Sequence, residues 1–452
     1  MLPAVFQPFL EQAPLCVMTR LTLERLFDAK RLDELFQHTA QVQYQRELLF
    51  SQLVELMLSV VLRVHPSVHA AYHKDVARLT VSDQAVYDKL QGMELGVSAA
   101  LVADSAARLT PLLDALDERS PDWVPGYRTR VVDGNHLAQT QRRIKELRPT
   151  WAAALPGTVL AVYEPALDLV TRVCLTPDGH AQERTLFGDV LALVQRRDLW
   201  VADRQYCTLG LLSGIAARQG VFAIRQHGKL PFRLTGQRRY RGRTPTGRVY
   251  EQAMELDYQG QTLRVRRVTV ELEQPTRDGD TAIHVVTNLP KKAADAREVA
   301  EVYRKRWTIE GRFYEVTQTL HCEPNTLGYP KAALFAFCLA LVASNAVALL
   351  RAALRAAHEE EAVDEMSPYS MALEIRTAYV GMMIALPAAH WAAVAREHDT
   401  DVAGLLREVA GYVKPEKYRK VRRGPKKPPP KKSAYKNGGH VSTHKLLQKR
   451  QE

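Results

Sequence analysis

The sequence predicts an α/β fold, in which a mixed sheet with helices is interrupted by a β-rich insertion and flanked by helical regions. Three observations predict it. Residues 126–226 hold short β-branched runs between helical patterns, residues 227–281 alternate polar and apolar positions, and most other segments up to 413 have helical periodicity. The 452 residues are 46% hydrophobic and 25% charged, which excludes wholesale disorder, a fibrous repeat and a polytopic membrane protein.

The first region, residues 1–125, is predicted to be helical. A dense apolar pattern over Arg46–Val64 ends before Pro66, whose ring breaks helices. A second helix is expected from Ser82, a capping residue, with Val86 and Leu90 four residues apart. This helix either packs on its neighbours or reads DNA, and the packing interpretation is favoured because recognition helices lack a strong signature.

The predicted core is divided in two parts, residues 126–226 and 282–350. The first part alternates strands and helices, and the second begins with a strand at 282–287 and continues into a long amphipathic helix from about Ala294 to Thr319. The expected elements of the first part are strands at 130–133, 158–163, 169–175, 199–203 and 221–225 and helices at 184–194 and 208–219.

The insertion, residues 227–281, is predicted to consist of antiparallel strands with a cationic hairpin. Between Lys229 and Arg248 there are seven basic residues and no acid. With Phe232, Tyr240 and Tyr250 available for stacking, this segment could grip bases or phosphates. A solvated basic loop without a ligand is the alternative.

A charge-free stretch of 19 residues, 332–350, is long enough to cross a bilayer. Seven of its residues are alanine, and Ser344 and Asn345 lie within it. Alanine drives insertion weakly and a central asparagine is costly in lipid, so a buried helix is predicted and no membrane partner is expected. Residues 351–413 are predicted to form a helical C-terminal region.

The net charge of +12 comes entirely from the tail. Residues 414–452 contain 14 Lys/Arg and 2 Asp/Glu, which leaves residues 1–413 neutral. This basic tail is predicted to be flexible and indicates a polyanionic partner. The five cysteines are scattered without metal-ligand spacing, and no signal peptide is recognisable, so a reducing cytoplasm is expected.

Three acids form the predicted active site. Asp133 and Asp203 end predicted strands, and Glu310 shares one face of the long helix with Tyr303 and Arg306. Each acid alone is as readily a turn cap or half of a surface ion pair. Three carboxylates brought together need a compensating charge, and Mg²⁺ prefers such oxygen ligands. The set therefore predicts phosphoryl transfer on DNA with two metal ions.

Two further side chains fit that chemistry. Arg306 suits a bidentate contact to phosphate, and Trp307 offers a ring face to an unstacked base.

Residues 131–135 (VVDGN), 201–204 (VADR) and 303–310 (YRKRWTIE) resemble the three acidic motifs of bacterial insertion-sequence DDE transposases, in the group with a Tyr-Arg-Glu-Lys helix signature and a β-rich insertion. The resemblance covers roughly residues 125–350. It implies a ribonuclease H-like core, Mg²⁺ with Mn²⁺ as a substitute, an N-terminal DNA-binding domain, and a homodimer on terminal inverted repeats and target DNA. It also implies a cytoplasmic, nucleoid-associated location in a bacterium.

Carried over by position, the resemblance implies that Asp133, Asp203 and Glu310 hold the metal and that Tyr303 and Arg306 bind phosphate. The complete set of expected DNA contacts is Tyr303, Arg306, Trp307, Arg204 and Arg225.

One position departs from the family pattern: Thr317 stands where the signature has lysine, and Lys331 is too far along to replace it. Arg312 or Lys305 is expected to take over that phosphate, or activity is impaired. Glu315 and Glu323 are alternative third acids outside the Tyr/Arg frame. Three hypotheses stay open: an active transposase, which is favoured, a catalytically silent DNA-binding descendant, and a nuclease of the same fold that cleaves without joining.

Overall fold

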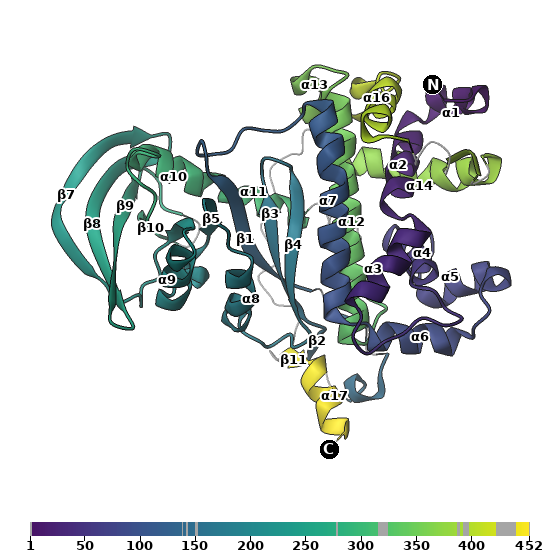
Figure 1. Cartoon of the computed structure of the whole chain (residues 1–452), viewed down its shortest axis with the longest axis horizontal. Coiled ribbons are helices and arrows are strands. Elements are labelled where there is room, and N and C mark those ends of the chain that lie inside the picture. Colours follow the sequence, from purple (N-terminus) through teal and green to yellow (C-terminus); the bar gives the residue numbers. More distant parts are fainter. Residues whose placement is uncertain are drawn as a thin grey trace.

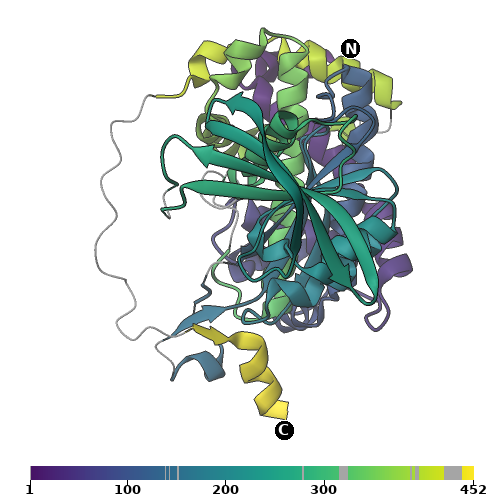
Figure 2. The same cartoon turned by 90° about the vertical axis from the view of Figure 1, so that its left-hand side faces the viewer.

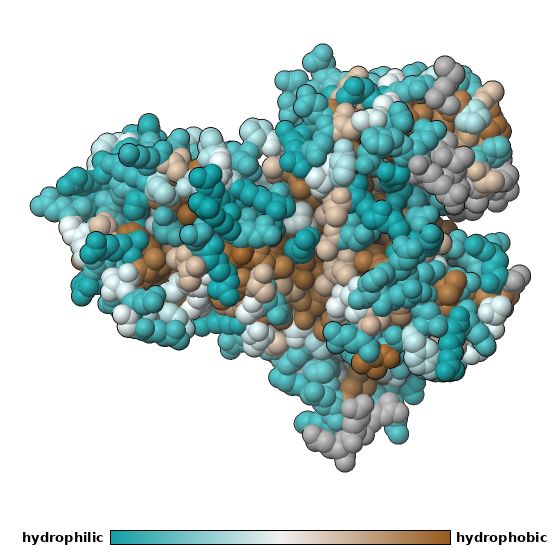
Figure 3. All heavy atoms as spheres, viewed as in Figure 1, coloured by the Kyte–Doolittle hydropathy of each residue, from teal (hydrophilic) through white to brown (hydrophobic). Residues whose placement is uncertain are grey.

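The computed structural model places a broad twisted sheet beside a body of helices (Figure 1). It describes residues 2–137, 139–141, 143–149, 152–276, 279–314, 324–386, 389–391, 397–421 and 440–451. Hydrophilic residues cover most of the face seen in Figure 1, and hydrophobic residues show in its hollowed middle (Figure 3). Thr317, Glu315 and Glu323 lie outside the described residues.

Nine strands of the described chain form one mixed sheet in the order β4-β3-β1-β5-β6-β10-β9-β8-β7. Strands β1, β5 and β6 run parallel in its middle, and the neighbours on both sides pair antiparallel. The strands are β1 (Arg128–His136), β3 (Thr158–Glu164), β4 (Leu169–Thr176), β5 (Asp198–Ala202), β6 (Val221–Arg225), β7 (Arg233–Thr244), β8 (Gly247–Tyr258), β9 (Gln261–Leu272) and β10 (Ala282–Thr287).

The β-rich insertion is not a separate layer but a continuation of the central sheet. Strands β7, β8 and β9 form the predicted antiparallel meander, and the whole of β10 pairs with residues 266–271 of β9. Figure 2, which faces this side, shows the strands fanned by the twist of a single sheet. The outer strands are therefore rigidly connected to the middle of the sheet.

Alternating side chains bury the two faces of the sheet against different helices. Val131 and Val201 belong to the core that includes α7 (Leu95–Leu116) and α12 (Pro330–Arg355). Their neighbours Val132 and Ala202 point to the opposite face, under α8 (Phe187–Ala192) and α9 (Leu209–Ala217). The sheet is thus the middle of three layers, which is the α/β arrangement predicted.

The remaining helices pack on the far side of α7 and α12 (Figure 1). In α6, the Ser82 side chain accepts a hydrogen bond from the Ala85 amide, and Val86 and Leu90 are buried, so the apolar face of this helix packs inward. These helices are α1 (Gln7–Gln12), α2 (Pro14–Leu26), α3 (Ala29–Thr39), α4 (Phe50–Val61), α5 (Val68–Asp75), α6 (Asp83–Gly92), α13 (Glu360–Asp364), α14 (Pro368–Ala385) and α16 (Asp399–Ala410).

Helix α12 contains the charge-free stretch and is buried, as predicted. By length and composition it is the one helix in the described chain that could span a membrane, but 94% of its most apolar window is buried within the protein. The buried polar residue Asn345 within this helix has hydrogen-bond partners on β4. Its side-chain oxygen accepts from the Val170 amide and its side-chain nitrogen donates to the Val170 carbonyl, both at 2.9 Å. Because β4 is an edge strand, the Val170 backbone has no neighbouring strand on that side, and the Asn345 side chain supplies the hydrogen bonds that such a strand would make.

The single long helix predicted over residues 294–319 is wrong. The structure has α10 (Ala296–Arg304), a 3₁₀ turn η6 (Lys305–Trp307) and α11 (Thr308–Tyr314). The tighter winding occurs at Arg306, whose side chain is buried in the protein instead of lying on a continuous helix face. Residues 315–323 are outside the described chain.

The prediction of a flexible tail over residues 414–452 is also wrong for its described parts. Tyr418, within the 3₁₀ turn η8 (Pro415–Tyr418), is buried and its hydroxyl bonds to Glu374. Strand β11 (His440–Ser442) pairs in parallel with β2 (Ala153–Leu155), and α17 (Thr443–Gln451) follows at the bottom of Figure 1. The apolar cluster that holds them consists of Ile144, Leu147, Ala154, Tyr329, Val441, Leu446 and Leu447.

Candidate active site

The first two acids lie at the same edge of the central parallel strands. Asp133 was predicted to end its strand but lies inside β1, which continues to His136 because β3 pairs with it that far. The parallel pairing with β5, however, ends at Val131 and Val201, and Asp203 directly follows β5. Both carboxylates therefore lie where the parallel strands end, the usual position of ligand sites in α/β sheets.

Asp203 also has the structural role that strand-end aspartates often have. Its Oδ1 accepts a hydrogen bond of 2.7 Å from the Gln205 amide and caps the 3₁₀ turn η5 (Arg204–Tyr206). Only this one oxygen is used by the cap, so the cap leaves the other oxygen for a further contact.

Arg306 joins the first and third acids. Its guanidinium donates to Asp133 Oδ2 at 3.0 Å and to Glu310 Oε1, in the first turn of α11, at 2.8 Å. The side chain of Arg306 is 6% exposed, that of Asp133 16% and that of Glu310 43%. Arg306 was expected to contact phosphate, but here it supplies the positive charge that the acids need.

The environment disfavours the charge of Asp133. Burial, together with the negative charges of Asp203 and Glu310, raises the pKa of Asp133 to about 6. Arg306 and the Gly134 amide, which donates to Asp133 Oδ1 at 3.0 Å, act in the opposite direction. The mutual influence of these charges shows that Asp133, Asp203 and Glu310, remote in sequence, are brought together.

A fourth carboxylate, Glu183, was missed by the sequence reasoning. It begins the 3₁₀ turn η4 (Glu183–Leu186), at the edge of the predicted helix 184–194. Its Oε1 lies so close to Gly134 that a Cβ at that position would be 2.0 Å away. Burial and the charges of Asp203 and Asp133 raise the pKa of Glu183 to about 7. The available signal was Gly134 itself, since a glycine within a strand often marks the close approach of another group.

Tyr206 completes this side of the cluster. The side chain is fully buried, and its ring stacks on Phe187 at a centroid distance of 5.3 Å. Its hydroxyl is within hydrogen-bonding reach of the Glu183 carboxylate. Burial and the charges of Glu183, Asp133 and Asp203 raise the pKa of Tyr206 well above its usual value.

The other predicted DNA contacts are distributed around the acids. Tyr303 is buried, and burial raises the pKa of its hydroxyl. Trp307 is 61% exposed, with the Arg306 guanidinium 5.1 Å from its ring centroid. Arg225 pairs with Asp280 at 2.6 Å, and Arg204 is exposed in η5.

The cations considered as substitutes for the missing lysine lie elsewhere. The Lys305 ammonium is 5.8 Å from the Trp123 ring centroid, and exposed Lys331 lies in the first turn of α12, where its charge acts on Glu94. The side chain of Arg312 is not described.

The cationic segment of the insertion is less charged than its sequence indicates. The run 229–248 contains no acid, but β8, β9 and the residue after β9 place glutamates beside it. Four arginines of the run form ion pairs with them: Arg233 with Glu255, Arg238 with Glu271, Arg241 with Glu251 and Arg243 with Glu273. Exposed aromatic rings are present nevertheless, at Phe232 and Tyr240.

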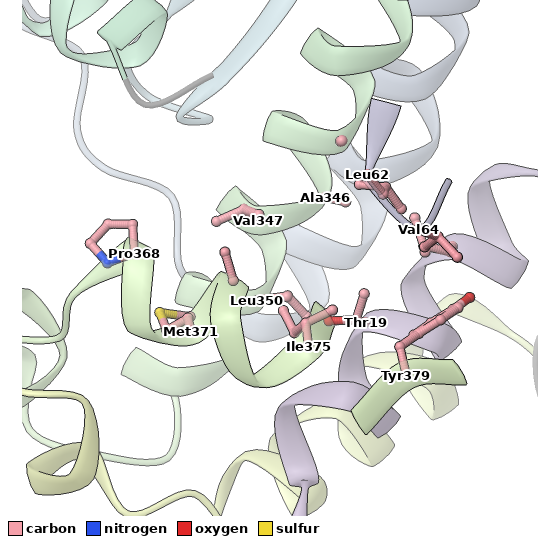
Figure 4. Close-up of a pocket in the computed structure, with 13 residues that line it drawn as sticks. Thr19, Leu62, Val64, Ala346, Val347, Leu350, Pro368, Met371, Ile375 and Tyr379 are labelled. Atoms are coloured by element: carbon pink, nitrogen blue, oxygen red, sulfur yellow. The ribbon is translucent and has the colours of Figure 1, made fainter. Parts of the chain in front are cut away.

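Two cavities differ sharply in character. A polar cleft of about 840 Å³ adjoins the acids and is lined by Glu183 and by His136, His180, Arg184, His227 and Lys229 among others. A small apolar cavity of about 80 Å³ lies far from them, between α2, α12 and α14 (Figure 4). The described residues that line it include Thr19, Tyr379 and aliphatic side chains but no acid or base. The polar cleft is therefore the better candidate for a catalytic site.

The donor set fits a divalent cation in its chemistry. As placed, no three His, Cys, Asp or Glu side chains of the described residues stand close enough to hold a metal ion. The charges of Asp203, Glu310 and Glu183 nevertheless interact with that of Asp133, and one guanidinium contacts only two of these four carboxylates, which leaves an excess of hard, negatively charged oxygens of the kind that Mg²⁺ binds. An ion between Asp133 and Glu310 would require Arg306 to leave its present position.

Acids from separated segments that meet at the carboxyl ends of parallel strands, beside a polar cleft, define a candidate hydrolase or transferase of the phosphoryl-transfer class. Residues 124–346 match the family model described as "Transposase DDE domain", which is just under half of the chain and includes Asp133, Asp203 and Glu310. The match supports a DDE transposase.

The search of curated proteins found no match. Among solved structures, a similar one is "Cryo-EM structure of piggyBac transposase synaptic complex with hairpin DNA (SNHP)", with a TM-score of 0.39, 6% identity, and coverage of 83% of this chain and 82% of that chain. A likeness at this level supports no statement about mechanism.

Proposed function

We propose that this protein is a DNA transposase of the bacterial insertion-sequence type, with a ribonuclease H-like core, that cleaves the terminal inverted repeats of its element and joins them to target DNA. The observation that carries the proposal is the convergence of Asp133, Asp203 and Glu310 within the part of the chain that matches the DDE domain. Divalent cations, Mg²⁺ or Mn²⁺, belong to the proposal, as do a homodimer on paired ends and a cytoplasmic, nucleoid-associated location.

The residues have distinct tasks in this proposal. The carboxylates of Asp133, Asp203 and Glu310 would hold two Mg²⁺ ions, which when bound activate a water or 3′-hydroxyl and stabilise the leaving oxygen. Arg306 would exchange its bonds to Asp133 and Glu310 for a bidentate contact to a phosphate, an acceptor of the same geometry. Tyr303 would donate to the same phosphate, and the exposed ring of Trp307 would stack on an unpaired base.

The bonds exchanged are simple. In cleavage the oxygen of a water attacks phosphorus and the 3′ oxygen of the neighbouring nucleotide leaves. In joining, that 3′-hydroxyl attacks a phosphodiester of the target, and a target 3′ oxygen leaves. Arg204, Arg225 and the aromatic residues of β7 and of the turn before it would contact the DNA outside the reacting phosphate.

The test uses a plasmid with a resistance marker between the DNA stretches that flank the gene on its two sides. Excision and joining are measured in cells that express the wild type or Asp133→Asn, Asp203→Asn or Glu310→Gln. Each variant should lose at least about a hundredfold, because preorganised charge contributes that much to catalysis. Glu301→Gln is the matched control, since this acid lies on α10 and pairs only with Arg304 in the described structure.

Three results would contradict the proposal in different ways. Excision by Asp133→Asn at the parental rate would exclude the acid site. Salt-sensitive binding of the repeats without cleavage, even with Mn²⁺, would indicate a silent DNA-binding descendant. Cleavage without any joined product would indicate a nuclease.

A further inference from the structure

The polar cleft beside the acids lies at the ends of all three parallel strands. His136 ends β1, Gln205 belongs to the turn that Asp203 caps after β5, and Lys229 follows β6 by four positions. Residues 179–184, in the turn before α8, form a further wall. The cleft is therefore built from the same strand ends that position the acids.

The cations of this cleft are not neutralised as those of β7 are. Arg184 and Lys229 are exposed, and neither forms an ion pair within the part of the chain that the structure describes. Glu183 is the one acid among the described lining residues, and because burial and its neighbours raise its pKa to about 7, it is only partly charged at neutral pH. The cleft therefore offers positive charge to an anion.

His227 adds a hydrogen-bond donor without taking up a proton. Its Nδ1 accepts the Lys229 amide at 3.1 Å, so the hydrogen of the neutral ring is on Nε2. No phenylalanine, tyrosine or tryptophan is among the described lining residues, and bases stack on such rings. The lining therefore suits phosphate oxygens, whose contacts carry no sequence information.

The C-terminal helix borders the same cleft. Lys445 of α17 pairs at 3.1 Å with Asp178, which directly precedes the wall formed by residues 179–184. The helix also contains Lys449 and Arg450, and it contains no acid. The docked end of the basic tail thus adds positive charge at the rim of the cleft, which favours a polyanion over a single phosphate.

The side chains assigned to an unpaired base lie in a different cavity. Tyr303 and Trp307 line a cavity of about 500 Å³ between α10 and the strands β9 and β10, and its described lining shares no residue with that of the polar cleft. A phosphodiester held at the acids has DNA on both sides. At the end of an element, one side has a defined sequence and the other side has the sequence of whatever DNA surrounds the element.

We propose that the polar cleft binds the phosphate backbone of the flanking DNA, beyond the phosphodiester to be cut, through Arg184, Lys229 and His227. The inference rests on the proposed function, because it assigns the two sides of that substrate to two cavities. The flank differs from one insertion to the next, so contacts confined to phosphates allow one cleft to accept any flank.

The test measures binding of fluorescein-labelled duplexes to the full-length protein by fluorescence anisotropy, in EDTA and over a range of KCl concentrations. Replacing Arg184 and Lys229 together by glutamine should make the plot of log K against log[KCl] less steep by about 1.8, because each phosphate contact contributes about 0.9. The effect should be equal on two duplexes of unrelated sequence. The matched control replaces Arg196 and Arg218, exposed arginines that precede β5 and β6 at the opposite ends of these strands, and should leave the slope unchanged.

A second measurement separates flanking DNA from target DNA. The Arg184→Gln/Lys229→Gln variant should excise the marked element at least about tenfold less often than the wild type. It should join an element end that has already been cut to target DNA at the parental rate. Thermal unfolding of each variant checks that the fold is retained.

An unchanged salt slope in the Arg184→Gln/Lys229→Gln variant would overturn the proposal. Excision at the parental rate together with poor joining of cut ends would also overturn it, because the cleft would then hold target DNA. In both cases Asp133→Asn still fails to excise. Failure of the proposed function gives a different result, since Asp133→Asn then excises at the parental rate.

Discussion

Replacing Asn345 by leucine should destabilise the protein by about 3 kcal/mol, although leucine has nearly the same shape and suits the apolar helix around it. The side-chain amide of Asn345 makes three hydrogen bonds in a fully buried position: two with the backbone of Val170 and one, at 3.2 Å, to Ser105 Oγ. It thereby joins α12 to β4 and α7.

The magnitude follows from the groups left without partners. The Val170 amide and carbonyl would both stay buried and unpaired, at about 1–3 kcal/mol each. Burial of the leucine methyl groups stabilises the fold by about 1 kcal/mol and offsets part of this cost. Ser105→Ala removes the third bond and also the hydrogen bond that Ser105 Oγ donates to the Val102 carbonyl at 2.7 Å, so it should cost about 1–2 kcal/mol.

The assay is urea denaturation followed by circular dichroism, with the single variants and the double variant. In the Asn345→Leu background, Ser105→Ala should cost less than in the wild type, because its bond with Asn345 is already gone while its bond to the Val102 carbonyl remains. An Asn345→Leu variant as stable as the wild type would refute the reasoning, since it would mean that Val170 finds other partners or that β4 does not lie against α12.

Three further predictions concern other parts of the molecule. Arg306→Gln should bind Mn²⁺ at least about tenfold more tightly, because it removes a unit charge a few Å away, and yet excise less DNA. His284 is kept neutral by burial and nearby arginines, which lower its pKa to about 4. Below pH 6.5 the unfolded chain therefore takes up a proton at His284 that the folded chain does not, which lowers the free energy of unfolding of the wild type by about 2 kcal/mol between pH 7.5 and pH 5. This decrease should be absent in His284→Gln. Deleting residues 440–452 should speed hydrogen exchange in β2, the pairing partner of β11, without affecting α7.

Each of these has a result that would contradict it. Unchanged Mn²⁺ affinity in Arg306→Gln would mean that the guanidinium does not compete with the ion. Parallel pH–stability curves for the wild type and His284→Gln would mean that the imidazole is charged in the fold. Unchanged exchange in β2 after the deletion would mean that β11 does not pair with it in solution.

The central strands could be predicted because β-branched runs are local signals, and the place of Asp203 because it directly follows one of these runs. Glu183 could not, because its proximity to Gly134 depends on how the turn before α8 folds back over β1. For the same reason the basic run 229–248 was read as a free cationic surface: its partners, such as Glu251 and Glu271, come from strands further along the chain.

The errors in the helix over 294–319 and in the tail have a related origin. The apolar stripe of Val299, Val302, Ile309 and Phe313 is buried as expected, but periodicity does not reveal the 3₁₀ turn that turns Arg306 inward. In the tail, the high lysine content predicted a flexible segment. It gave no indication that Val441, Leu446 and Leu447 pack on apolar residues of a distant segment, 144–154.

The unbroken sheet has a geometric consequence for any duplex bound to this protein. Strand β7 is five places from β5, the strand that Asp203 follows, so with about 4.8 Å between strands it lies roughly 24 Å away across the sheet. That span is about seven base pairs of B-form DNA at 3.4 Å each. Since each of these strands is hydrogen-bonded to the next, the sheet holds this distance: under the proposed function, the bases contacted at its far edge determine which phosphodiester is presented for cutting.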